Sequence, residues 1–108
     1  MSNIKTLTAK EQEILQLLKT VVDPEVAVNI VDLGLVYEIN LKEDKQSIQV
    51  IMTMSTRGCP LGDVIVENVQ LVIEANYSGY KADVEVVWEP EWSPDLITEA
   101  GRKAIEEL

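Results

Sequence analysis

The strongest constraint on the fold of this chain is a pair of alternating segments joined by a short polar turn. Apolar residues occupy every second position over residues 35–41 and again over 48–54, and residues 42–46 between them are polar. A period of two is typical of strands with one buried face. The pattern predicts an antiparallel hairpin with Tyr37 and Ile39 on the buried face. Such a hairpin needs other elements to cover that face.

Helical patterns supply the covering elements. Thr8 and Glu11 form a capping-box pattern, and the apolar residues after them recur at helical spacing. We expect Asp23-Pro24 to end this helix, because the residue before a proline is pushed out of the α region. Pro60 suits the start of a second helix, and Ser93-Pro94-Asp95 offers an N-cap, a proline and an acid for a third. In chain order we expect helix 9–21, strands 35–41 and 48–54, helix 60–76, strand 82–88 and helix 94–107.

The second helix carries more apolar residues than one buried face requires. Its polar stripe consists of Asp63, Glu67, Gln70 and Glu74. The opposite side holds Leu61, Val64, Ile65, Leu71, Val72 and Ala75. Val66, Val69 and Ile73 widen this apolar arc. Two interpretations follow: a helix set deep in the core, or a flank that packs on a second subunit.

The order helix, strand, strand, helix, strand, helix implies an α+β fold. We expect a two-layer single domain over residues 1–108, with a small three-stranded mixed sheet whose strand order the pattern leaves open. A chain of 108 residues buries one modest core, so any functional site is expected at an edge or an interface.

Residue counts exclude several classes of function. The chain has no histidine, which removes Ser–His and Cys–His catalysis and histidine-ligated zinc. Its single cysteine forms neither an internal disulfide nor a four-thiolate metal site. The net charge of −10 argues against nucleic acid and anionic membranes as partners. It favours solubility, or a basic partner that meets the acidic C-terminal third. With no targeting or membrane-spanning pattern, we expect a cytoplasmic protein with a reduced thiol.

Cys59 occupies the position in the chain that most favours a reactive side chain. The segment from Ser55 to Pro60 joins the second strand to the second helix, so Cys59 is expected near a helix N-terminus, where free N–H groups favour a thiolate. Arg57 adds a positive charge. The alternative is that Cys59 is a small apolar core residue, as single cysteines often are. Its position beside Gly58 favours a functional loop.

Two further segments allow both a structural and a functional interpretation. Asp23-Pro24-Glu25 is a favourable turn sequence, or else it presents carboxylates next to Cys59. The segment from Trp88 to Pro94 has two tryptophans that cover the sheet, or else form a docking surface for a partner together with Glu89 and Glu91.

Four strings together resemble a known family. They are Asp23-Pro24-Glu25, Asp32-Leu33-Gly34-Leu35-Val36-Tyr37, Thr56-Arg57-Gly58-Cys59-Pro60 and Glu89-Pro90-Glu91-Trp92-Ser93-Pro94. The chain resembles, over residues 11–105, the small iron–sulfur cluster assembly domains that include SufT and PaaD. Val26 and Ser55 depart from the usual pattern in size and not in chemical type. PaaD-like members carry extra C-terminal cysteines that are absent here, which favours the stand-alone SufT-like branch.

The resemblance implies a role in the maturation of iron–sulfur proteins, with Cys59 as functional thiol and metal ligand. It also implies that Asp23, Glu25 and Thr56 line the same pocket. Clusters are usually held by four thiolates, so one cysteine per chain cannot hold a cluster alone. We therefore expect Cys59 to be a transient ligand, shared with a scaffold, a carrier, an apo-protein client, a small thiol or a second copy in a homodimer.

Two other functions remain open. The protein is an adaptor that recruits clients or scaffolds through Trp92, Glu89 and Glu91 without touching iron, or it is a thiol enzyme with Cys59 as nucleophile. We do not expect an enzyme, because the chain offers no histidine base to activate that thiol.

Overall fold

The computed structural model describes residues 7–55 and 62–107. In chain order its elements are α1 (Ala9–Leu18), β1 (Val22–Asp23), β2 (Val28–Asn29), β3 (Val36–Lys42), the 3₁₀ turn η1 (Glu43–Lys45), β4 (Ser47–Met52), α2 (Gly62–Asn76), β5 (Lys81–Val86), the 3₁₀ turn η2 (Pro94–Leu96) and α3 (Glu99–Glu106).

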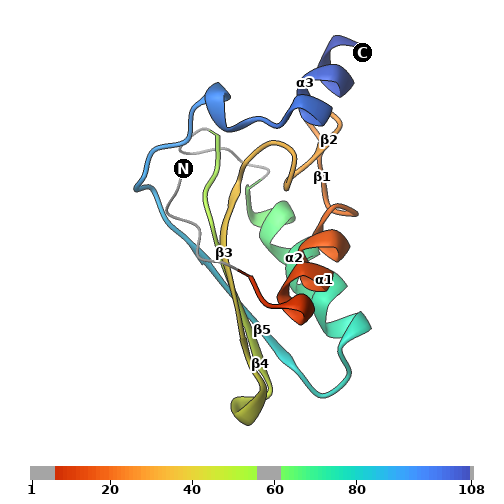
Figure 1. Ribbon diagram of the computed structural model, residues 1–108, viewed down its shortest axis with the longest axis vertical. Helices are drawn as coiled ribbons and strands as arrows, with labels where there is room; N and C mark the ends of the chain where they lie inside the picture. Colours follow the sequence, from red (N-terminus) through yellow and green to blue (C-terminus); the bar gives the residue numbers. More distant parts are fainter. Residues whose placement is uncertain (1–6, 56–61, 108) are drawn as a thin grey trace.

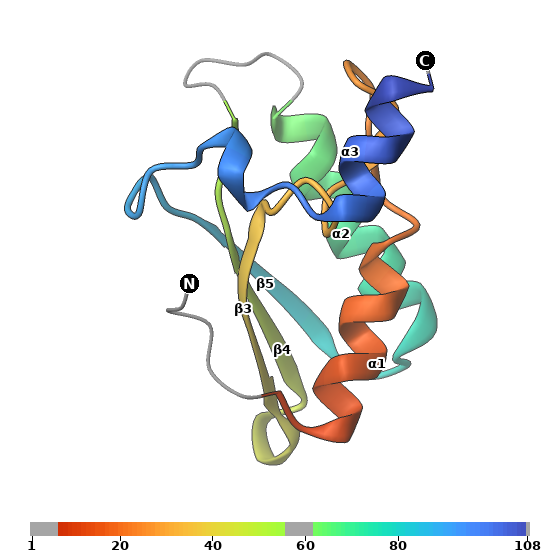
Figure 2. The same ribbon diagram turned by 45° about the horizontal axis from the view of Figure 1, so that its top comes forward.

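The main sheet has the order β3-β4-β5, with β3 antiparallel and β5 parallel to the central β4. The chain crosses from β4 to β5 through α2, because parallel neighbours cannot be joined by a tight turn. Figures 1 and 2 show α1 and α2 on the same face of this sheet. Fully buried side chains fill the space between the layers, among them Ile14, Leu18, Ile39, Ile48, Val50, Met52, Ile65, Val69 and Ile73. The prediction of a two-layer α+β fold with a small mixed sheet is confirmed. The two-stranded sheet of β1 and β2 was not expected.

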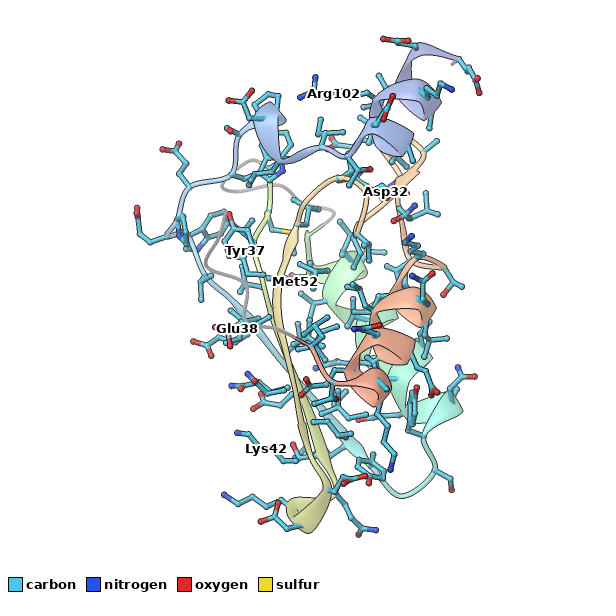
Figure 3. All side chains as sticks on the ribbon, in the orientation of Figure 1. Asp32, Tyr37, Glu38, Lys42, Met52 and Arg102 are labelled. Atoms are coloured by element: carbon cyan, nitrogen blue, oxygen red, sulfur yellow. The ribbon has the colours of Figure 1, made fainter. Side chains whose placement is uncertain are left out.

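The β3–β4 hairpin forms as predicted, but its register shifts at Tyr37. Ile39 lies opposite Val50, whereas Val36 lies opposite Met52, so β3 holds an extra residue between them. A bulge of this kind reverses the alternation beyond it. Val36 is therefore buried, and the prediction that Tyr37 shares the buried face with Ile39 is wrong. Figure 3 shows Tyr37 on the side of the sheet that faces away from the helices.

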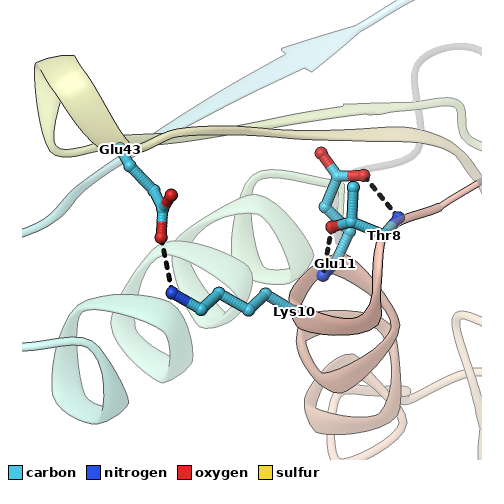
Figure 4. A network of polar contacts seen from close by, with 4 residues as sticks. All are labelled: Thr8, Lys10, Glu11 and Glu43. Atoms are coloured by element: carbon cyan, nitrogen blue, oxygen red, sulfur yellow. Dashed lines mark hydrogen bonds and ion pairs between the residues drawn. The ribbon is translucent and has the colours of Figure 1, made fainter.

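The first helix starts as expected and ends early. Thr8 Oγ1 accepts from the N–H of Glu11, and Glu11 Oε1 accepts from the N–H of Thr8, which confirms the capping box (Figure 4). The helix ends at Leu18 instead of residue 21. Beyond it, the carbonyl of Val21 accepts from the N–H of Ile30, so the chain pairs with a distant segment and leaves the helix.

The two remaining helices also differ from expectation. In α2 the buried residues are Ile65, Val69 and Ile73, whereas Val64 is 43% exposed and Leu71 is 64% exposed. The helix is therefore not enclosed on all sides, and the expected start at residues 60–61 lies outside the described residues. In the C-terminal region, Pro94–Leu96 form only a 3₁₀ turn, and α3 begins after Thr98, whose side chain caps it. Ser93 is not the cap of this helix, because contacts with Asp32 hold Thr98 in the N-cap position.

Candidate functional site

The parallel pairing of β4 and β5 determines where the chain leaves the sheet toward two of the segments that hold predicted site residues. Because these strands run in the same direction, their carboxyl ends lie at the same end of the sheet. The chain leaving β4 leads to the segment with Thr56 and Cys59, both of which lie outside the described residues. The chain leaving β5 leads to the segment from Trp88 to Trp92.

Buried residues lie close to the cysteine segment on both sides: Thr53 and Met54 before it, and Gly62 after it. Thr53 is fully buried, and its N–H donates to the carbonyl of Leu35 at 2.8 Å. Met54 is also buried, and a Cβ added to Gly62 would lie 3.7 Å from the Met54 sulfur. The chain therefore has firmly packed positions both shortly before Thr56 and shortly after Cys59.

Asp23 stabilises a tight turn, so the turn interpretation of Asp23-Pro24-Glu25 is confirmed. Its Oδ1 accepts from the N–H of Glu25 at 2.8 Å, and its carbonyl accepts from the N–H of Ala27 at 2.8 Å. This turn joins β1 to β2, so Asp23 does not lie at the C-terminus of α1 as expected. The expectation that Asp23-Pro24 ends the first helix is therefore wrong, because Asp23 pairs with Val28 in the two-stranded sheet.

The β1–β2 turn lies at the same end of the molecule as the carboxyl end of β4 and the N-terminus of α2 (Figure 2). The Asp23 side chain is buried, whereas Glu25 is exposed. Contacts between these carboxylates and Thr56 or Cys59 fall outside the described residues. Their shared pocket stays a prediction.

The segment after β5 is anchored by two hydrogen bonds, one to β3 and one to the turn that precedes β3. The indole Nε1–H of Trp92 donates to the carbonyl of Leu33 at 2.8 Å. The hydroxyl of Tyr37 donates to the carbonyl of Pro90 at 2.7 Å. Glu91 lies between these anchors and Glu89 directly before them, and both are exposed, while Trp92 is half-buried. The two carboxylates are therefore presented to solvent by a fixed backbone.

Burial raises the pKa of Tyr37. The Thr53 hydroxyl nearby lowers the pKa in part, and the negative charge of Glu89 raises it further. The neutral phenol that donates to Pro90 is therefore the stable form of Tyr37 near neutral pH.

Asp32 is a positioning residue that the sequence analysis did not single out. Its two carboxylate oxygens accept from the amide of Asn29 at 2.8 Å and from the hydroxyl of Thr98 at 2.9 Å. Its carbonyl also accepts from the N–H of Thr98 at 2.8 Å. Gly34 lies close by with φ +79°, and a Cβ there would collide with the carbonyl of Leu96. Asp32 and Gly34 both belong to the string Asp32-Leu33-Gly34 that was noted in the sequence. In the structure this string packs against the C-terminal segment.

Among residues 7–55 and 62–107, no cluster of three or more acidic or cysteine side chains is arranged to hold a metal ion. Within the same ranges, no helix combines the length and the apolar character that a membrane crossing requires.

Comparisons with known proteins agree on one family. A family model described as iron–sulfur cluster assembly protein matches residues 11–86. The Fe-S protein maturation auxiliary factor YitW of Bacillus subtilis is 35% identical over 97 residues, which cover 90% of this chain and 94% of that protein. The Fe-S protein maturation auxiliary factor SufT of Staphylococcus aureus is 35% identical over 85 residues, which cover 79% and 96% respectively.

A solved structure supports the same relationship. The crystal structure of a domain of unknown function, DUF59, from Bacillus anthracis has a TM-score of 0.84 and 35% sequence identity to this chain. The match covers 91% of this chain and 92% of that one. The region matched by the family model includes Asp23, Glu25, Thr56 and Cys59. The chain therefore belongs to the iron–sulfur cluster assembly protein family, and within it the chain is SufT-like.

Proposed function

We propose that this protein is an auxiliary factor in the maturation of iron–sulfur proteins, and that Cys59 is a transient ligand of the cluster in transit. The family match over residues 11–86 carries the proposal, because it contains Cys59 together with the Asp23 turn. The partners are a scaffold or carrier that brings the cluster and an apo-protein that receives it. We propose that this takes place in the cytoplasm.

The cysteine count determines what Cys59 contributes. Thiolates are the usual ligands of iron–sulfur clusters, and four are usually needed. This chain provides one, so the other ligands come from the donor, the recipient, a small thiol or a second copy of the chain. A site with one ligand binds weakly and releases readily, which suits transfer better than storage. In this proposal the protein carries out no catalytic step of its own.

The surrounding architecture supports a site at this end of the molecule. Met54 and Gly62 are buried on either side of the cysteine segment, and the hydrogen bonds of Asp23 hold the β1–β2 turn in shape. Packed flanks of this kind position functional loops in many proteins. Asp23 uses one carboxylate oxygen in the turn, so its proposed role is to position the turn.

Anaerobic cluster transfer tests the proposal. A cluster-loaded scaffold is mixed with an apo-ferredoxin, and transfer is followed by visible absorption with and without the protein. The wild type is expected to accelerate transfer, and Cys59→Ala is expected to reduce the rate to that of the mixture without the protein. Glu85→Gln, on β5 and exposed, is the control and should behave as the wild type. Equal acceleration by the wild type and Cys59→Ala would exclude the ligand role.

An adaptor function is the second candidate, supported by the exposed Glu89 and Glu91 on the anchored segment after β5. In a strain that lacks the protein, the adaptor predicts that Cys59→Ala restores maturation and that the double variant Glu89→Lys, Glu91→Lys does not. The transient-ligand proposal predicts failure of Cys59→Ala.

A further inference from the structure

A groove runs along the outer edge of β3. Its volume is about 430 Å³, within the range of pockets that hold ligands. The walls come from α1, β3 and the C-terminal segment 90–98. Its apolar lining includes Leu7, Leu15, Val31, Val36, Ile39 and Leu96, and Glu38 and Glu91 add two carboxylates. The groove is thus apolar inside and negatively charged.

Part of the β3 backbone faces this groove. The N–H of Leu41 points away from β4, because it donates to Oε2 of Glu11 at 2.9 Å. Outward and inward groups alternate along an antiparallel strand, so the N–H and C=O of Ile39 face the same outer edge. Within the described residues neither group has a hydrogen-bond partner there. A strand edge with open groups beside an apolar groove is suited to pairing with another chain.

The opposite edge of the sheet shows how such groups are otherwise covered. On β5, the N–H of Ala82 donates to Oε2 of Glu74 at 3.1 Å, so a glutamate from α2 closes that position. Glu11 from α1 does the same for Leu41. Ile39 lies two residues before Leu41 on β3. The Glu11 carboxylate contacts the N–H of Leu41, and the outward N–H and C=O of Ile39 face the groove.

We propose that this groove binds an extended segment of a partner protein, which adds to β3 as a further strand. Side chains of an added strand alternate between the two faces of the sheet. On the inner face they meet Ile39 and Leu15, so aliphatic side chains fit. On the outer face they meet Glu38, which Figure 3 shows pointing away from the helices, so basic side chains fit. The net charge of −10 favours the same basic segment.

Peptide binding at the groove is separate from the maturation role and is tested independently of it. A peptide can fail to bind the groove while Cys59 still accelerates cluster transfer, and the reverse also holds. The two experiments therefore fail separately.

The test is a titration of the full-length ¹⁵N-labelled protein with a capped heptapeptide of alternating valine and lysine, read by amide chemical shifts. We expect the largest shifts at Ile39, Val31 and Leu96, with the Ile39 amide moving downfield as it gains a hydrogen bond. A matched peptide of valine and glutamate should bind at least about tenfold more weakly, because like charges then meet at Glu38. Absence of shifts at the groove, or equal binding of the two peptides, overturns the proposal.

Charge variants on opposite edges of the sheet provide the matched control. Glu38→Lys should weaken binding of the valine–lysine peptide about tenfold. Glu91→Lys changes an exposed residue and gives a second variant if Glu38→Lys does not fold. Glu85→Lys makes the same charge change on the outer face of β5 and should alter binding by less than about twofold, because salt screens distant charges.

Equal effects of the Glu38 and Glu85 variants contradict binding at the groove. A second copy of the chain is the competing occupant. Groove shifts that appear on concentrating the protein alone, together with a dimer in sedimentation, assign the groove to that copy and overturn the proposal.

Discussion

Tyr37 shows how one displaced residue joins two parts of this molecule. The bulge in β3 moves it off the buried face, and its hydroxyl then reaches the carbonyl of Pro90 on a segment far along the chain. The same segment presents Glu89 and Glu91 and is anchored again through Trp92. An irregularity in strand pairing therefore determines where a candidate partner-binding segment lies.

Tyr37→Phe tests this link through its pH dependence. Burial raises the pKa of Tyr37 in the folded state above the unfolded value of about 10, so the unfolded state loses its proton first as pH rises. The contribution of neutral Tyr37 to the free energy of unfolding is complete below the pKa of the unfolded state. It is lost as pH rises through the raised pKa of the folded state. Urea unfolding from neutral to strongly alkaline pH should show a shallower loss of stability in Tyr37→Phe than in the wild type.

Near neutral pH, Tyr37→Phe should lower the free energy of unfolding by about 0.5–1 kcal/mol, the net contribution of a hydrogen bond. Tyr77, whose pKa is also raised by burial, supplies the comparison: Tyr77→Phe should retain the part of the slope that belongs to Tyr37. An alkaline slope unchanged by Tyr37→Phe would show that this tyrosine does not titrate differently on folding.

At the level of elements, α2 shows what a sequence pattern can leave undecided. Apolar residues cover so much of this helix that the sequence pattern was compatible with more than one buried face. The structure selects the stripe of Ile65, Val69 and Ile73, and leaves Val64 and Leu71 in solvent. The sheet decides between these faces, because only residues spaced by four along one side reach β4 and β5.

A pair of truncations in α2 measures this choice. Ile73 is fully buried, so Ile73→Ala should lower the free energy of unfolding by about 2–5 kcal/mol through lost burial and a cavity. Leu71 is 64% exposed, so Leu71→Ala should change it by no more than about 0.5 kcal/mol. Urea denaturation of both variants is the measurement. A large loss for Leu71→Ala would mean that this face is covered in solution, as packing on a second subunit requires.

On the scale of the whole molecule, charge opposes compactness. The chain has nineteen acidic and nine basic residues, so folding brings an excess of negative charges close together. The ion pair between Lys10 and Glu43, at 2.6 Å, lies in solvent with side chains 67% and 55% exposed. Exposed pairs of this kind contribute little to stability, so they do not offset the repulsion.

Salt should therefore stabilise the protein. Screening weakens repulsion among the acidic groups, so the thermal midpoint is expected to rise as NaCl increases from about 20 to about 200 mM. Differential scanning calorimetry in a buffer of constant pH checks this. A midpoint that falls over this range would indicate that attractive ion pairs outweigh repulsion in the folded state.

The sequence by itself determined the α+β class, the β3–β4 hairpin, the capping box at Thr8 and the turn at Asp23. These features depend on local physics: a period of two, a side chain that caps its own helix, and an Asp-Pro geometry. The family strings in the same sequence identified the role in iron–sulfur protein maturation, and the comparisons confirmed it.

Only the tertiary structure decided the remaining features. The early end of α1, the bulge at Tyr37, the late start of α3 at Thr98 and the exposed face of α2 all depend on partners far away in sequence. Val21 pairs with Ile30, and Asp32 holds Thr98. The N–H and C=O of Ile39 face outward because β3 is an outer strand of the sheet in the described part of the chain, and no local pattern specifies that position. Local preferences are weak compared with the burial and hydrogen bonding that assembly of the sheet and helices provides.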